Sequence, residues 1–121
     1  MLENQCGSIA KLDHVRAYIT DLEKSVNFYE EIFRFKIKNR FMRGEAKIAT
    51  LDMNGGLLEL IQRPGSPGTP PVGNWSHLVI YEPRFDETVA KVVTKGIEKR
   101  LITQSNGNKL CFFHDPEGHT L

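Results

Sequence analysis

The stretch LDHVRAYITDLEKSVNFYEEIF, residues 12–33, decides the fold. Its first eight residues alternate in the way that is typical of a β-strand with two different faces. The remainder begins with Asp21-Leu22-Glu23, a signal for a helix start, and then places apolar side chains at helical spacing. The stretch therefore predicts a strand followed by a helix. The apolar helical positions are Leu22, Val26, Tyr29 and Phe33.

The same pattern returns 63 residues later, and no gap is needed to align the two copies. The shift pairs 11–58 with 74–121, which gives 48 pairs, and eight of them are identical where random pairing would give roughly three. Turn glycines and a strand histidine are among the matches, so the chain predicts two copies of one module. The identical pairs are His14/His77, Tyr18/Tyr81, Val26/Val89, Lys36/Lys99, Gly44/Gly107, Asp52/Asp115, Gly55/Gly118 and Leu58/Leu121.

Each copy predicts a strand, a helix and three further short strands, which together form a βαβββ module. The later strands of the first copy are predicted at about 35–43, 47–53 and 57–62. The strands of the second copy are predicted at about 76–81, 97–104 and 109–114, with a last one that begins near His119. A segment rich in Pro and Gly links the copies. The predicted fold is α+β, a single domain over 1–121 in which module one (about 11–62), the linker (63–74) and module two (about 75–121) form curved sheets around a cleft.

The composition excludes several classes of function. Sixteen Lys and Arg against fifteen Asp and Glu give a formal net charge of +1, so we expect neither nucleic acid nor an anionic membrane as a partner. The basic run 36–43 is interpreted as a solvated strand face. No signal peptide or long apolar run is visible, which favours a cytoplasmic protein. Cys6 and Cys111 form no paired motif, and Cys111 is expected in the core.

Strand alternation places the chemically active side chains on the face that is turned away from the helix, which we interpret as the cleft face. They are His14, Arg16 and Tyr18 from the first strand, His77 and Tyr81 from its counterpart, and Glu59 from an otherwise apolar strand. A buried carboxylate needs a cation or several hydrogen-bond donors, and a divalent metal that binds two imidazoles and a carboxylate meets that need. Such ligands bind Ni, Zn, Fe, Mn or Co, and the ligand set alone does not identify which of these metals is bound.

The charged residues of this face allow other interpretations. Glu59 could form a buried ion pair with Arg16 or with Arg63 instead of binding a metal. Arg16 could equally hold an anionic part of a substrate, because a guanidinium binds carboxylate and phosphate groups well. The residues alone leave these alternatives open.

The aromatic residues and the remaining histidines are also open to two interpretations. Tyr18 and Tyr81 could line a substrate pocket or fill the interface between the sheets. His114 and His119 flank the last turn and have no histidine partners in the repeat. We therefore interpret these two histidines as loop residues near the rim of the cleft.

Two segments carry a resemblance to a known family. One is Leu12-Asp13-His14-Val15 followed by 20–29, and the other is 112–119 with its Asp-Pro-x-Gly turn. Together they resemble the signatures of the glyoxalase/bleomycin resistance/dioxygenase superfamily, also called the vicinal oxygen chelate superfamily. The resemblance runs from Lys11 onward and is more specific for fold than for reaction. Members include glyoxalase I, methylmalonyl-CoA epimerase, extradiol dioxygenases, fosfomycin-modifying enzymes and bleomycin-binding proteins.

The ligand pattern that is closest to this sequence is that of bacterial glyoxalase I, where the metal ligands run His, Glu, His, Glu. The resemblance implies His14, Glu59 and His77 as metal ligands, and it puts the fourth at position 122, one residue past Leu121. A glutamate at position 59 favours this pattern over that of the epimerases, which have glutamine there, and that of the dioxygenases. Two neighbouring positions argue against glutathione as the thiol partner. Tyr18 stands where glyoxalase I has an arginine, and Arg63 where it has an asparagine.

The resemblance thus implies an enzyme, a metal-dependent lyase or isomerase similar to lactoylglutathione lyase. Two vicinal oxygens of a small-molecule substrate would chelate one divalent metal. A carboxylate, Glu59 or one at position 122, would move a proton between adjacent carbons by way of an enediolate. Arg16, Tyr18 and Tyr81 are the expected substrate-binding residues. A homodimer is also implied. The alternatives are an epimerase or dioxygenase of the same fold, or a protein that binds a small molecule or a drug without chemistry.

Overall fold

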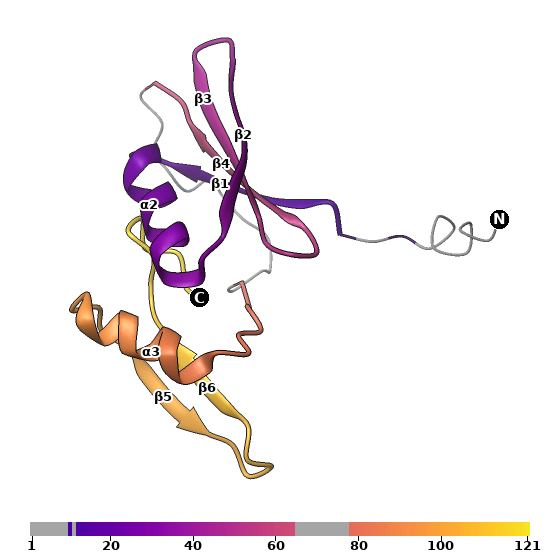
Figure 1. The fold of residues 1–121 in the computed structure, drawn as a ribbon. Helices are drawn as coiled ribbons and strands as arrows, with labels where there is room; N and C mark the ends of the chain where they lie inside the picture. The colour runs from indigo at the N-terminus through magenta and orange to yellow at the C-terminus, as the bar shows by residue number, and fades with distance from the viewer. Residues whose placement is uncertain (1–9, 11, 65–77) are drawn as a thin grey trace, which may run out of the picture.

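The computed structural model describes residues 10, 12–64 and 78–121, and it confirms an α+β fold with two helices and curved sheets (Figure 1). The elements of the first half are β1 (His14–Ile19), α2 (Leu22–Phe33), β2 (Lys36–Arg43), β3 (Ala46–Asp52) and β4 (Leu57–Gln62). The elements of the second half are α3 (Phe85–Thr94), β5 (Arg100–Thr103) and β6 (Lys109–Phe112). The helix and the strands predicted for the first half are therefore present, with bounds within two residues of those expected.

The first module is a four-stranded sheet with one helix packed on it. The strands are ordered β1-β4-β3-β2, with β1 parallel to β4 and the other neighbours antiparallel. Helix α2 begins where the sequence predicted, because the Asp21 side chain accepts a hydrogen bond from the Lys24 backbone N–H at 3.2 Å. The last strand, β4, thus lies in the middle of the sheet and is paired on both sides.

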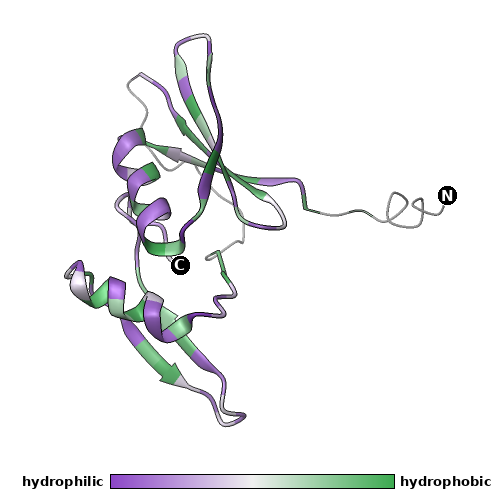
Figure 2. Cartoon of the chain, viewed as in Figure 1, coloured by the Kyte–Doolittle hydropathy of each residue, from purple (hydrophilic) through white to green (hydrophobic). Residues whose placement is uncertain are grey.

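The main hydrophobic core lies between α2 and the helix-facing side of this sheet. Leu58 and Leu60 of β4 reach it, as does Ile19 of β1, and each is at most 2% exposed. The second half of the chain contributes Val92 and Phe113 to the same core. Figure 2 shows α2 with alternating apolar and polar bands, which is the pattern of a helix with one buried face. The two halves are therefore held together by one core.

The second module departs from its prediction. Residues 78–81 form no strand, so the expected strand at 76–81 is wrong there, and positions 76 and 77 lie outside the described residues. The expected last strand is reduced to one bridge between His114 and Thr120. A strand needs a paired neighbour, and Thr120 and Leu121 supply only two residues of one. The predicted strands 97–104 and 109–114 shorten to the β5–β6 hairpin.

The side chains of residues 78–81 nevertheless alternate between two faces as predicted. Leu78 and Ile80 pack against the main core, while Val79 and Tyr81 are 73% and 89% exposed. Cys111 also packs against the core, in agreement with its predicted place. Within the residues described, no helix is long and apolar enough to cross a membrane.

Candidate functional site

The candidate site lies on the face of the four-stranded sheet that is turned away from α2. Strands β1 and β4 run side by side in parallel, in a register that sets Arg16 against Glu59 and His14 against Leu57. Because Leu58 and Leu60 point into the core, Glu59 points to the opposite face. The predicted sorting of side chains between the two faces is therefore confirmed for β1 and β4.

Glu59 is a buried carboxylate, with 6% of the residue exposed. Its Oε1 atom accepts a hydrogen bond of 2.6 Å from Nε of Arg16. This bond to Glu59 is the main reason that the pKa of Arg16 is raised above its ordinary value. Of the two ion pairs that the sequence left open, the structure contains the one with Arg16. Burying an ionised carboxylate without a cation costs desolvation free energy, and here the Arg16 guanidinium is that cation.

His14 is the second potential ligand on this face. Its Nε2 atom lies 3.9 Å from Oε1 of Glu59, and its Nδ1 atom lies 2.7 Å from Oδ2 of Asp13. A carboxylate on one ring nitrogen is the arrangement that commonly orients a histidine whose other nitrogen binds a metal. The His14 side chain is 37% exposed, so its ring is open to solvent and to a ligand.

Arg63 and Tyr18 form a separate pair on the same face. The Arg63 guanidinium lies 4.7 Å from the centroid of the Tyr18 ring and donates to its hydroxyl at 3.3 Å. Tyr18 also packs beside a small apolar cluster made of Ala46, Ile48 and Ile61. The sheet face thus places cationic and aromatic groups next to the buried carboxylate, an arrangement suited to a small anionic or oxygen-rich molecule.

A divalent metal fits the donors that are present, although the structure describes only part of the expected ligand set. His77 lies outside the described residues, and within them no group of three or more His, Cys, Asp or Glu is close enough to hold a metal. The two donors that are described, an imidazole nitrogen and a carboxylate oxygen 3.9 Å apart, are of the kinds that bind Zn, Ni, Fe, Mn and Co. His14 and Glu59 could therefore share one ion if Oε1 turned from Arg16.

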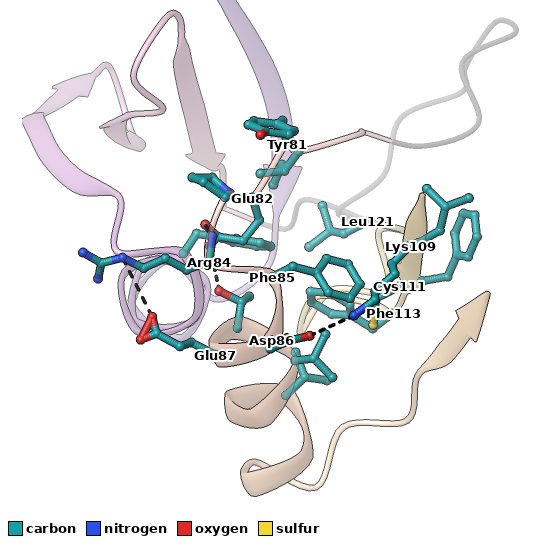
Figure 3. Close-up of a pocket in the computed structure, with 18 of the residues that line it drawn as sticks. Tyr81, Glu82, Arg84, Phe85, Asp86, Glu87, Lys109, Cys111, Phe113 and Leu121 are labelled. Carbon is teal, nitrogen blue, oxygen red and sulfur yellow. Dashed lines mark hydrogen bonds and ion pairs between the residues drawn. The ribbon is translucent and has the colours of Figure 1, made fainter. Parts of the chain in front are cut away.

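Tyr81, predicted beside Tyr18, lines a different feature. It borders an apolar groove between the segment 78–81, the start of α3, and β6 (Figure 3). The groove has a volume of about 770 Å³, and neither His14 nor Glu59 is among its lining residues. The structure thus groups His14, Arg16, Tyr18 and Glu59 on one sheet face and places Tyr81 elsewhere.

The sequence interpretation missed a hydrogen-bonded cluster around Asp115. This residue is 5% exposed, and its Oδ2 atom accepts a 2.7 Å hydrogen bond from the Tyr29 hydroxyl and lies 2.8 Å from Nδ1 of His119. Its Oδ1 atom accepts backbone N–H bonds from Glu117 and His119. His119 lies outside the helices and strands, as expected of a loop residue, and its side chain belongs to this cluster. The sequence could have singled out Asp115 through its match with Asp52 in the repeat.

The cluster shifts the pKa values of its members. Burial would raise the pKa of Asp115, but the hydrogen bonds from His119 and Tyr29 outweigh it and lower that pKa below its ordinary value. The bond to Asp115 raises the pKa of His119, and burial together with the Asp115 charge raises that of the Tyr29 hydroxyl. Because Tyr29 lies on α2, the cluster ties the C-terminal turn to the first module.

The fold and the site define a protein of the two-module α+β type with a polar face on its first sheet. The chain matches the model of the Glyoxalase/Bleomycin resistance protein/Dioxygenase superfamily over residues 11–121, and it belongs to that superfamily. The predicted resemblance is thereby confirmed.

Proteins of different activities are similar to this chain. The metallothiol transferase FosB of Lysinibacillus sphaericus (strain C3-41) is 29% identical over 119 residues, which cover 93% of this chain and 79% of that protein. A glyoxalase family protein from Enterococcus faecalis has a TM-score of 0.75 at 25% identity, over 94% of this chain and 96% of its own. The glyoxalase I of Leishmania major has a TM-score of 0.76 at 20% identity, over 93% of this chain and 84% of its own.

Proposed function

We propose that this protein is a metal-dependent enzyme that acts on a small oxygen-rich molecule, with a lyase or isomerase activity of the glyoxalase I type as the leading candidate. The observation that supports it best is the buried carboxylate of Glu59 on an open sheet face, 3.9 Å from the exposed ring of His14. A purely structural ion pair has no need of an imidazole that a neighbouring carboxylate orients toward it.

His14, Glu59 and His77 would hold the divalent metal, which when bound would supply Lewis-acid polarisation of two adjacent substrate oxygens. The Arg16 guanidinium donates a hydrogen bond of 2.6 Å to Oε1 of Glu59. Once Glu59 turns from it, Arg16 is free to bind an anionic part of the substrate. Glu59 is also the candidate base that moves a proton between adjacent carbons, and Tyr18 borders the space that the substrate would occupy.

The similarity to a metallothiol transferase supports a second candidate, the transfer of a thiol to a small substrate at the same metal site. Both candidates use His14, Glu59 and His77, so they differ in substrate and not in ligands. Tyr81 would then serve the substrate only if the groove that it borders opens onto the site. A homodimer and a cytoplasmic location remain predictions from the sequence and the resemblance.

Metal content is the first test. We expect about one divalent ion per chain by elemental mass spectrometry, and we expect His14→Ala, Glu59→Gln and His77→Ala each to lose it. The matched control is His114→Ala, because His114 is exposed and lies in the second module. Loading of all three variants at the parent level would contradict the proposed site.

Substrate screening then separates the candidates. Turnover of hemithioacetals or 2-oxo compounds by the loaded protein would support the glyoxalase type, and consumption of a thiol with an electrophilic partner would support the transferase. Oxygen uptake with catechols would instead identify a dioxygenase. Parent protein that takes up no Ni, Zn, Mn, Co or Fe would favour the non-catalytic binding alternative.

A further inference from the structure

The Tyr18 hydroxyl lies between two guanidinium groups on the polar face of the first sheet. Arg63 donates to the hydroxyl oxygen at 3.3 Å, and its guanidinium lies 4.7 Å from the centroid of the Tyr18 ring. Arg16 reaches the same side chain, because residues 16 and 18 of β1 share one face of the strand. The hydrogen bond with Glu59 raises the pKa of Arg16 most, and a hydrogen bond with Tyr18 raises it further. One phenol oxygen therefore joins two cations.

The positive charges of these two guanidinium groups are compensated unequally. Arg16 has a carboxylate partner, since its Nε atom donates to Oε1 of Glu59 at 2.6 Å. Within the described residues no carboxylate pairs with Arg63, whose polar contact is the neutral hydroxyl of Tyr18. A guanidinium has five N–H donors, and both arginine side chains are open to solvent. Donors of both groups can therefore reach a ligand.

The Arg63 guanidinium is held in position by the ring on which it stacks. Tyr18 packs beside the apolar cluster made of Ala46, Ile48 and Ile61, and the two isoleucines are at most 2% exposed. A cation that is already stacked on a packed ring loses less side-chain freedom when it binds a ligand than one on a mobile side chain. The donors that face solvent are thus preorganised.

Glu59 competes with any ligand for this pair of cations. Its carboxylate takes the Nε donor of Arg16 and compensates one of the two positive charges. When that carboxylate turns to another partner, Arg16 and Arg63 become like charges that are joined by a neutral hydroxyl, which is unfavourable without a counterion. Carboxylate and phosphate groups suit such a place, because their oxygens accept paired hydrogen bonds from guanidinium groups.

We propose that Arg16, Tyr18 and Arg63 form a binding site for one anionic group, a carboxylate or a phosphate, which Glu59 masks while it pairs with Arg16. The anion site does not depend on a bound metal. Its role as the holder of an anionic group of the substrate rests on the proposed function. Because Arg16 contacts Glu59 directly, this anionic group would lie next to the chelating oxygens of the substrate.

Sulfate titration of protein that has been stripped of metal with a chelator tests the anion site. Glu59→Gln nearly keeps the size of the side chain but removes the charge that masks Arg16. We expect sulfate to bind this variant at least about tenfold more tightly than the parent protein at low ionic strength. In the Glu59→Gln background, Arg63→Gln should weaken sulfate binding by at least about fivefold. Calorimetric titration measures both ratios.

Two further variants are matched controls for the loss of a cation and of a carboxylate. Arg43→Gln, in the Glu59→Gln background, removes a guanidinium that lies 5.7 Å from the centroid of the Phe41 ring, beside the same apolar cluster. Glu23→Gln, in the parent background, removes a carboxylate that pairs with Arg40 at 2.8 Å where both side chains are largely exposed. We expect each control to change the affinity for sulfate by less than about twofold.

Equal sulfate binding by the parent protein and Glu59→Gln would overturn the proposal. An equal loss in Arg43→Gln and Arg63→Gln would also overturn it, because it would indicate a general effect of net charge. If Glu59→Gln does not fold, the parent protein decides the question. The Nε–H NMR signals of Arg16 and Arg63 should then shift together at high sulfate while that of Arg43 stays in place, and any other pattern would contradict the site.

The metal-loaded protein separates this proposal from the proposed function. A substrate with a carboxylate beside its chelating oxygens should have a higher kcat/KM than its methyl ester, and Arg63→Gln should lose that preference. Turnover without the preference would overturn the role of the site in substrate binding. Absence of both metal and turnover would contradict the proposed function, and the sulfate titration of the metal-free protein would still decide the anion site.

Discussion

Replacing Arg16 by Met tests whether the Glu59 carboxylate, which now pairs with Arg16, also serves as a metal ligand. The change removes the 2.6 Å bond to Oε1 of a carboxylate that is 6% exposed and keeps most of the apolar stem. Breaking a fully buried ion pair costs about 3–5 kcal/mol. The Arg16 side chain is 37% exposed, so water screens the pair, and we expect a loss of about 2 kcal/mol in the free energy of unfolding.

The expected loss can be measured directly. An unfolding entropy of about 2.1 cal/mol/K per residue gives a chain of this length about 0.25 kcal/mol/K, so 2 kcal/mol lowers the melting temperature by about 8 °C. Arg40→Met is the control, because Arg40 pairs with Glu23 where both side chains are largely exposed. We expect the free energy of unfolding of Arg40→Met to fall by less than about 1 kcal/mol.

Metal affinity should move in the opposite direction. A metal that binds Oε1 in the parent protein must first break the bond to Arg16, whereas Arg16→Met has already lost it. We expect metal to bind about 30-fold more tightly to this variant, which is the same 2 kcal/mol expressed as an affinity. Calorimetric titration of both proteins with Zn and Ni measures this ratio. Equal or weaker binding in Arg16→Met would refute the reasoning, because Glu59 would then be only a partner of Arg16.

Three further predictions concern the second module. Asp115→Asn replaces the Oδ2 acceptor of Tyr29 and His119, and it should cost about 3 kcal/mol by urea unfolding, against about 1 kcal/mol for Tyr29→Phe; equal losses would contradict the cluster. The pKa of His119 is raised by Asp115, so its stabilisation is present below about pH 6.5 and is lost as the pH rises through the raised pKa. The stability gap between parent and His119→Gln should therefore be larger at pH 5.5 than at pH 9, and a constant gap would be inconsistent with the shift. Burial raises the pKa of the Cys111 thiol, so in a Cys6→Ser background it should react with an aromatic disulfide at pH 8 about tenfold more slowly than free cysteine; an equal rate would show an open thiol.

The fold was largely predictable because its signals are local and repeated. The alternation in 12–19 fixes which side chains share a face, and the structure confirms it through Ile19 in the core and Arg16 on the opposite side. The helix start at Asp21 followed from a capping residue whose bond to Lys24 is present. Such features depend on a few neighbouring residues, and these are visible in the sequence.

In the second module, the repeat predicts the side-chain pattern correctly but not the secondary structure. Its sequence has the same pattern at 76–81, and its side chains alternate as expected, yet 78–81 is not a strand. The reason is that strand formation depends on pairing and not on pattern alone. Leu78 and Ile80 both pack against the core, but among the described residues only Leu78 of these two has a backbone hydrogen-bond partner, at Thr120.

The same distinction explains what could be predicted of the site. Repeat and alternation placed His14 and Glu59 on one face because both depend on strand register. The choice of Arg16 over Arg63 as the partner of Glu59 depends on side-chain reach across two strands, and Arg63 lies instead on the ring of Tyr18. Since Arg16 donates to the carboxylate oxygen nearest His14, the proposed metal site requires a divalent ion to compete with Arg16 for that oxygen.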